Sequence, residues 1–163
     1  MPITINAFND EYLRDHAVDS FNDIQNHTPT MNITFNSADT IEPKVSLRGV
    51  VPNEARLNDD PSAPMYFSDV VMTPSTGINL SLYDIGMVQV LKGPQGTLFG
   101  RNSTAGAILI NPKLPGEEFG GFVDLTACNY GMYRTDFGVD VPVTDTFQLR
   151  FAGRKLERDG YQT

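Results

Sequence analysis

The sequence contains no tryptophan, one cysteine and two histidines among its 163 residues. A single cysteine can form neither an internal disulfide framework nor a zinc cage of thiolates. Acidic residues outnumber basic ones by 20 to 12, and this balance offers no basic surface for a phosphate backbone, so we expect no nucleic-acid partner. The chain also lacks the run of about 18 apolar residues that a membrane-spanning helix needs, and it lacks the basic, then apolar start of a signal peptide.

Glycine and proline are plentiful, with 14 and 11 residues, and hydrophobic residues make up 40% of the chain. This length is typical of one domain, since domains usually have about 100 to 200 residues. The composition therefore predicts a β-rich domain with many turns and a modest core, and it argues against a long helical bundle.

Short helices and strands are predicted in the first part of the chain. Residues 2–8 alternate as in a strand, and Asn9 is placed to cap a helix over residues 10–16. A second helix is predicted to begin at Asp19 or Ser20 and to end before Pro29. Both helices are too short to be stable alone, so we expect them to pack on a sheet.

Further strands and polar loops are predicted as far as residue 112. The predicted strands are 31–35, 45–47 after a turn at Glu42-Pro43, 65–72, 88–91 and the apolar run 107–110; the predicted loops are 51–64 and 73–81. Between them, residues 92–101 form a glycine-rich segment. A phosphate-binding loop has its lysine after the glycines, whereas Lys92 precedes them, so we interpret this segment as a tight, packed turn.

The pattern changes after Pro115, and we place a domain boundary after residue 114. Three segments of about ten residues follow, apolar on one side and charged on the other, joined by turns at 129–131 and 142–145. This pattern is typical of transmembrane β-barrel strands. An antiparallel sheet with one solvated face would show the same alternation, so the pattern alone leaves both possibilities open. The apolar positions are Phe119, Val123, Leu125, Ala127, Tyr133, Phe137, Val139, Val141, Phe147, Leu149 and Phe151.

No catalytic or metal-binding motif is present. His16 and His27 are separated by a predicted helix break and lack metal-ligand spacing, so we expect solvated or capping histidines. Cys128 has no histidine nearby, which favours a small packed side chain over a nucleophile. The sequence therefore predicts a protein that is not an enzyme and that has no cofactor and no metal site.

Three segments resemble the plug of TonB-dependent outer-membrane receptors. They are residues 45–50 (VSLRGV), 66–70 (YFSDV) and the long, specific block 82–108 (LYDIGMVQVLKGPQGTLFGRNSTAGAI). The resemblance extends over essentially the whole chain. It implies an α+β fold in which residues 1–114 form a small mixed-sheet plug with short helices. Residues 115–163 would then form about three antiparallel strands of an incomplete barrel, whose full form in this family has about 22 strands.

The resemblance also implies roles for individual residues. Two plug loops would point outward to the ligand and would carry Asn53, Glu54, Arg56, Asn58, Asp59 and Asp60 in the first loop and Thr73, Ser75, Thr76 and Asn79 in the second. Arg48, Lys92 and Arg101 match basic positions that form charged locks, and Gly49, Gly93, Pro94, Gly96, Gly100 and Gly106 match structural positions of the plug.

The sequence departs from the family pattern in one turn and at two acidic positions. Its Asp-Gly turn is Ser68-Asp69 here, which predicts a less stable hairpin because glycine's positive φ is lost. Gly86 and Gln89 replace two acidic residues of the family, so part of the usual salt lock is expected to be absent.

The function implied is the plug, or gate, of a receptor in the outer membrane of a Gram-negative bacterium that takes up an iron-siderophore or a similar scarce nutrient. Its partners would be this small ligand, TonB, the outer membrane and the receptor's own β-barrel. Because the chain begins after the family's signal peptide and TonB-binding box and ends after three barrel strands, we expect a truncated fragment that is not transport-competent alone. The alternative is a self-contained secreted or periplasmic β-rich ligand-binding module.

Overall fold

The computed structural model describes residues 4–36, 39–51, 61–72, 81–100, 102–129, 131–144 and 146–158. The chain divides into two compact units, residues 1–112 and 113–163. The first combines short helices with a mixed sheet and the second is an antiparallel sheet, so the predicted α+β class is confirmed. Within the described ranges, no helix is long and apolar enough to cross a membrane.

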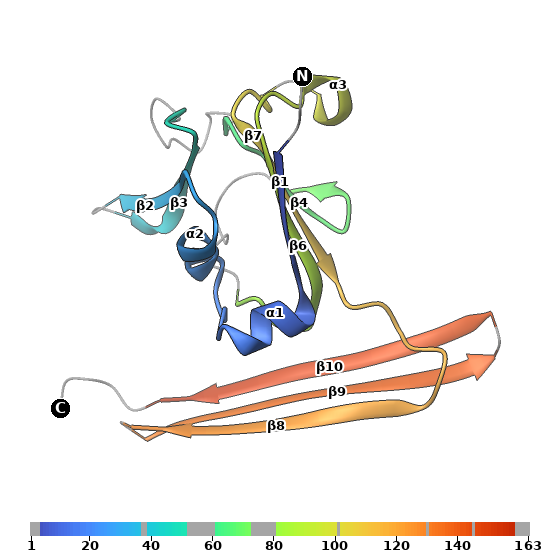
Figure 1. The fold of residues 1–163 in the computed structure, drawn as a ribbon. Helices are drawn as coiled ribbons and strands as arrows, with labels where there is room; N and C mark the ends of the chain where they lie inside the picture. Colours follow the sequence, from blue (N-terminus) through green and yellow to red (C-terminus); the bar gives the residue numbers. More distant parts are fainter. Residues whose placement is uncertain are drawn as a thin grey trace. The chain divides into compact units, whose positions relative to one another are not determined.

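A five-stranded mixed sheet organises the first unit, with strand order β1-β6-β7-β4-β5 (Figure 1). β6 pairs antiparallel with β1 and β7, whereas β7 and β4 are parallel. The central strands β6 and β7 are mostly buried, as expected for strands with continuous apolar runs that other parts of the fold cover. The strands are β1 (Thr4–Asn9), β4 (Met65–Phe67), β5 (Val70–Val71), β6 (Ile85–Lys92) and β7 (Gly106–Pro112).

The predicted capping residues do begin the helices. Asn9 caps α1 (Asp10–Asp15), because its side-chain oxygen accepts a hydrogen bond from the Tyr12 N–H at 2.9 Å. Ser20 precedes a 3₁₀ turn, η1 (Phe21–Asp23), and both its N–H and its hydroxyl donate to Asp23 Oδ2, at 2.8 and 2.7 Å. The turn continues as α2 (Ile24–His27), one turn long, so its stability must come from packing.

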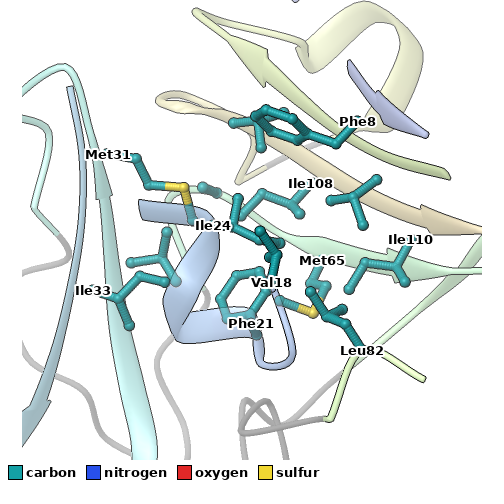
Figure 2. Close-up of a cluster of buried hydrophobic side chains, with 14 of the residues drawn as sticks. Phe8, Val18, Phe21, Ile24, Met31, Ile33, Met65, Leu82, Ile108 and Ile110 are labelled. Carbon is teal, nitrogen blue, oxygen red and sulfur yellow. The ribbon is translucent and has the colours of Figure 1, made fainter. Parts of the chain in front are cut away.

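That packing is supplied by one hydrophobic core, whose side chains come from α2, the sheet and the hairpin of β2 (Met31–Asn36) and β3 (Asp39–Leu47). Phe21 and Ile24 are each 1% exposed and lie between Met31 and Ile33 on one side and Ile108 and Ile110 on the other (Figure 2). Burying a side chain of this size contributes about 1.5 to 3 kcal/mol. The short helices are therefore held by the sheet, as the sequence predicted.

Two strand predictions were wrong. The turn expected at Glu42-Pro43 is absent, since β3 (Asp39–Leu47) runs through these residues and pairs Pro43 with Phe35 of β2 (Met31–Asn36). A proline signals a turn, but the edge of a two-stranded sheet needs no N–H from it. The single strand expected over 65–72 is instead the hairpin β4–β5, which turns at Ser68-Asp69.

Three long antiparallel strands in the order β10-β9-β8 make up the second unit. They are β8 (Gly120–Cys128), β9 (Met132–Thr144) and β10 (Phe147–Glu157). The register places Phe137 between Val123 and Gly153, and Asp136 between Asp124 and Arg154. Because neighbouring residues point to opposite faces, one face is apolar and the other is charged.

Candidate functional site

The predicted ligand loops fall outside the described residues. Asn53, Glu54, Arg56, Asn58, Asp59 and Asp60 lie within 52–60, Thr73, Ser75, Thr76 and Asn79 lie within 73–80, and Arg101 is likewise outside the described ranges. The described candidate site is therefore the structural part of the prediction, around Arg48, Lys92 and the glycine-rich segment.

Arg48 and Gly49 form the tight turn that follows β3. Both have positive φ, 54° and 78°, and Val50 N–H closes the turn on Leu47 O at 3.0 Å. The Arg48 N–H donates to Thr30 O at 2.9 Å, and its guanidinium Nη2 donates to Thr4 Oγ1 at 3.0 Å. One residue thus joins the β3 end, the turn before β2 and the first strand.

Lys92 ends β6 and is 5% exposed. Its Nζ donates to Pro29 O at 2.6 Å, and among the described residues no carboxylate contacts it. Burial, and then the nearby Arg48 charge, lower the pKa of Lys92 below its ordinary value. The Lys92 ammonium therefore bonds a backbone carbonyl. This hydrogen bond, which is not an ion pair, links the segment before β2 to the sheet.

The glycine-rich segment is a closed loop pinned by its own backbone. Gly93 N–H donates to Ala105 O and Gln95 N–H to Ser103 O, both at 2.9 Å. Its tip is a short helix, α3 (Gly96–Phe99), where the sequence predicted only a turn. The Tyr66 hydroxyl donates to Phe99 O at 2.9 Å, so strand β4 fixes this helix.

A glycine is required at position 106, where the glycine-rich loop returns to the sheet. A Cβ built on it would collide with the Leu91 carbonyl oxygen and would lie 2.8 Å from Leu47 Cδ1. Leu47 of β3 and Ala107 of β7 are both fully buried, so the close-packed core leaves no room for β3 or β7 to shift. This glycine lets β7 approach both β6 and the Arg48 turn.

The charged face of the second unit carries paired side chains that the sequence analysis did not identify. Arg154 donates two hydrogen bonds to Asp136, from Nε to Oδ1 at 2.7 Å and from Nη2 to Oδ2 at 2.8 Å. Arg150 Nη1 lies 2.6 Å from Asp140 Oδ2. Both pairs are directly opposed across β9 and β10, so only the strand register could have predicted them.

The other face of this sheet is apolar and exposed. Its exposed fractions reach 75% for Leu125, 69% for Val123 and 58% for Phe151. A soluble protein rarely leaves such a continuous apolar surface uncovered. The face is therefore suited to contact with lipid or with a further apolar partner.

Comparison with known proteins identifies the family of this chain. Residues 1–107 match the family profile described as the TonB-dependent receptor plug domain. The chain belongs to the TonB-dependent receptor plug family. The match spans the plug elements from β1 to the start of β7, including the Arg48 turn, Lys92 and the closed glycine loop.

Proteins similar in sequence to this chain are receptors. The chain is 31% identical over 133 residues to the pesticin receptor of Yersinia pestis, and the match covers 82% of this chain and 19% of that protein. It is 29% identical over 149 residues to the ferripyoverdine receptor of Pseudomonas aeruginosa, covering 91% of this chain and 18% of that protein. The chain thus spans under a fifth of the length of these curated relatives.

A solved structure extends the likeness beyond the plug match. The ferric yersiniabactin uptake receptor FyuA from Yersinia pestis superposes with a TM-score of 0.78 at 26% identity, over 96% of this chain and 24% of that one. This coverage includes strands of the second unit as well as the plug. The similarity therefore extends to both units of the fold.

The interpretation of Cys128 was wrong, and the structure adds a contact between the two histidines. Cys128, expected to be packed, is exposed at the last position of β8. His16, expected to be a solvated or capping histidine, is indeed exposed at the C-cap of α1, and the structure adds that its ring centroid lies 5.4 Å from that of His27. The residues between the two helices fold back on themselves, with Ala17 at φ 50° and Val18 N–H bonded to Leu13 O at 2.9 Å, which sequence spacing does not reveal.

Proposed function

We propose that this chain is the plug and the first barrel strands of an outer-membrane receptor that takes up an iron-siderophore or a similar scarce nutrient in a Gram-negative bacterium. Residues 1–114 act as the plug domain and residues 115–163 as the first strands of the barrel. TonB, the ligand and the rest of the barrel are the partners. The named specificities of the relatives, ferripyoverdine and ferric yersiniabactin, support the siderophore class.

The observation that carries this proposal is the two-faced sheet that follows the plug. Its apolar face is exposed, whereas Asp136 on the opposite face is 7% exposed and bonded to Arg154. In barrel strands, lipid covers the outer face and the polar side faces inward. A self-contained soluble module would instead need cover for Leu125, Val123 and Phe151, and their exposure favours the membrane role over that alternative.

In this role the plug's described part is the fixed frame and its two outward loops meet the ligand. The frame consists of the Arg48 turn, the Lys92 bond and the closed glycine loop, and it joins β1, β2 and β6 at one end of the sheet. The protein binds and gates, and we propose no bond chemistry for it.

A titration of the full chain in detergent with ferripyoverdine or ferric yersiniabactin tests the function. We expect saturable binding of at least one of them, and we expect Arg56→Ala to weaken it by about tenfold, as loss of one charge-assisted hydrogen bond would. Arg14→Ala is the matched control, because Arg14 is an exposed arginine on α1 whose ion pair with Asp10 spans 3.4 Å. Equal affinities for the two variants, or no binding of either siderophore, would contradict the proposal.

A further inference from the structure

Two histidines and a tyrosine form a cluster on the surface of the first unit. His16 is exposed at the end of α1, His27 is half-buried at the end of α2, and Tyr12 is half-buried on α1. The Tyr12 ring stacks on His16 with centroids 4.0 Å apart and meets His27 edge-on at 5.6 Å. The tyrosine therefore contacts both imidazoles and orients them.

The hydrogen bonds of the cluster use one nitrogen of each imidazole and leave the other open. His16 Nδ1 lies 3.0 Å from Tyr12 O, and because a carbonyl can only accept, Nδ1 carries the proton and Nε2 keeps its lone pair. His27 Nδ1 lies 3.1 Å from the Tyr12 hydroxyl. Within the described part of the chain, neither Nε2 atom has a hydrogen-bond partner.

Metal-binding histidines have this same arrangement. A histidine ligand almost always donates its other ring N–H to a carbonyl or similar acceptor, which fixes the tautomer and the ring direction. The bond from His16 to Tyr12 O is of this kind, and the Tyr12 hydroxyl can accept the corresponding bond from His27.

The spacing of the rings also suits a shared ion. Zinc lies about 2.0 to 2.1 Å from an imidazole nitrogen, so two rings on one tetrahedral ion have centroids about 5.2 Å apart. The centroids of His16 and His27 are 5.4 Å apart and their planes cross at 82°. The separation of the two rings therefore matches that of two imidazoles on one ion.

We propose that His16 and His27 chelate a first-row transition-metal ion such as Zn²⁺ or Cu²⁺ through their Nε2 atoms, with Tyr12 as the residue that positions both rings. Imidazole suits these ions. No group of three or more His, Cys, Asp or Glu is placed for a metal among the described residues, so water completes the coordination. The site is accordingly open and exchangeable, and it is independent of the siderophore function.

Calorimetric titration of the full chain with ZnCl₂ tests the site, in a Cys128→Ser background that removes the exposed thiol. We expect one ion to bind, His16→Gln and His27→Gln each to weaken its binding by more than about tenfold, and Tyr12→Phe to weaken it by about tenfold because the hydrogen bond between the Tyr12 hydroxyl and His27 is lost. Because His16 is exposed, its variant keeps the fold, and far-UV circular dichroism checks this. Unchanged affinity in His16→Gln, or no zinc binding by the parent at millimolar concentration, would overturn the proposal.

A spectroscopic readout identifies the ligands directly. Electron paramagnetic resonance of the chain with one equivalent of Cu²⁺ is expected to show two equatorial imidazole nitrogens in the parent and one in His16→Gln. The same nitrogen count in both would show that the ion sits elsewhere and would overturn the proposal.

Discussion

Gly106→Ala is expected to destabilise the plug more than any other single methyl addition at a described glycine of the first unit. The new Cβ would collide with the Leu91 carbonyl oxygen and would press on Leu47 Cδ1, which is 2.8 Å away. Leu91 belongs to the neighbouring strand β6, whose residue Lys92 pairs with Gly106. The methyl group can therefore be accommodated only if β6 and β7 separate at the point where the Arg48 turn packs on them.

The size of the effect follows from this geometry. Extra atoms in a packed core cost about 1 to 3 kcal/mol when side chains can adjust, and here the obstacle is backbone. We therefore expect a loss of at least about 3 kcal/mol, a large share of the roughly 5 to 15 kcal/mol that stabilises a typical domain. At a urea m-value of about 1 to 3 kcal/mol/M, the unfolding midpoint should fall by about 1 to 3 M.

Gly96→Ala is the matched control. Nothing lies within 4 Å of a Cβ at Gly96, which is the exposed first residue of α3. Alanine should raise stability by about 0.5 to 1 kcal/mol, because it restricts the unfolded chain and favours the helix. Urea unfolding of both variants, followed by circular dichroism, gives the comparison. Similar midpoints for Gly106→Ala and the parent would refute the close packing of β6, β7 and the Arg48 turn.

Two further substitutions test the hairpin and the buried lysine. Asp69→Gly should raise the free energy of unfolding by about 0.5 kcal/mol, because Asp69 has φ 65°, a conformation that glycine adopts without strain. Asp69→Ala keeps the strain and should give no gain. An equal gain in stability from both substitutions would contradict this reasoning. Lys92→Met should leave stability at pH 7 within about 1 kcal/mol of the parent, whereas breaking a buried ion pair would cost about 3 to 5 kcal/mol. Because the folded state lowers the pKa of Lys92, the unfolded chain binds more protons between that lowered value and 10.5, so parent stability should rise with pH across this window and the rise should be absent in Lys92→Met. Identical pH slopes in urea titrations would contradict the burial of the charge.

Local signals in the sequence predicted a large part of the fold. Asn9 begins α1 because its side chain caps the Tyr12 N–H, and Ser20 begins η1 because the Asp23 side chain caps the Ser20 N–H; such short-range effects can be read from the chain. Residues 107–110 could be predicted as a buried strand for the same reason, since four consecutive apolar residues leave no polar face.

Features that depend on distant residues could not be predicted in this way. Pro43 pairs with Phe35 inside the two-stranded sheet, and His16 meets His27 because the chain between the two helices folds back. The family resemblance implied a charged lock at Lys92, but only the structure identifies Pro29 O as its hydrogen-bond acceptor. The positions of the candidate site were thus available from the sequence, whereas their bonding partners were not.

The most direct test of the proposed barrel strands compares neighbouring residues that point to opposite faces of the second unit. Single cysteines at Leu125 and Asp124, and at Phe151 and Ala152, would be introduced in the Cys128→Ser background and spin-labelled in lipid bilayers. Labels at Leu125 and Phe151 should collide more with oxygen, which concentrates in lipid, and labels at Asp124 and Ala152 more with a polar nickel chelate. Equal accessibility of both reagents at neighbouring positions would contradict a lipid-facing sheet.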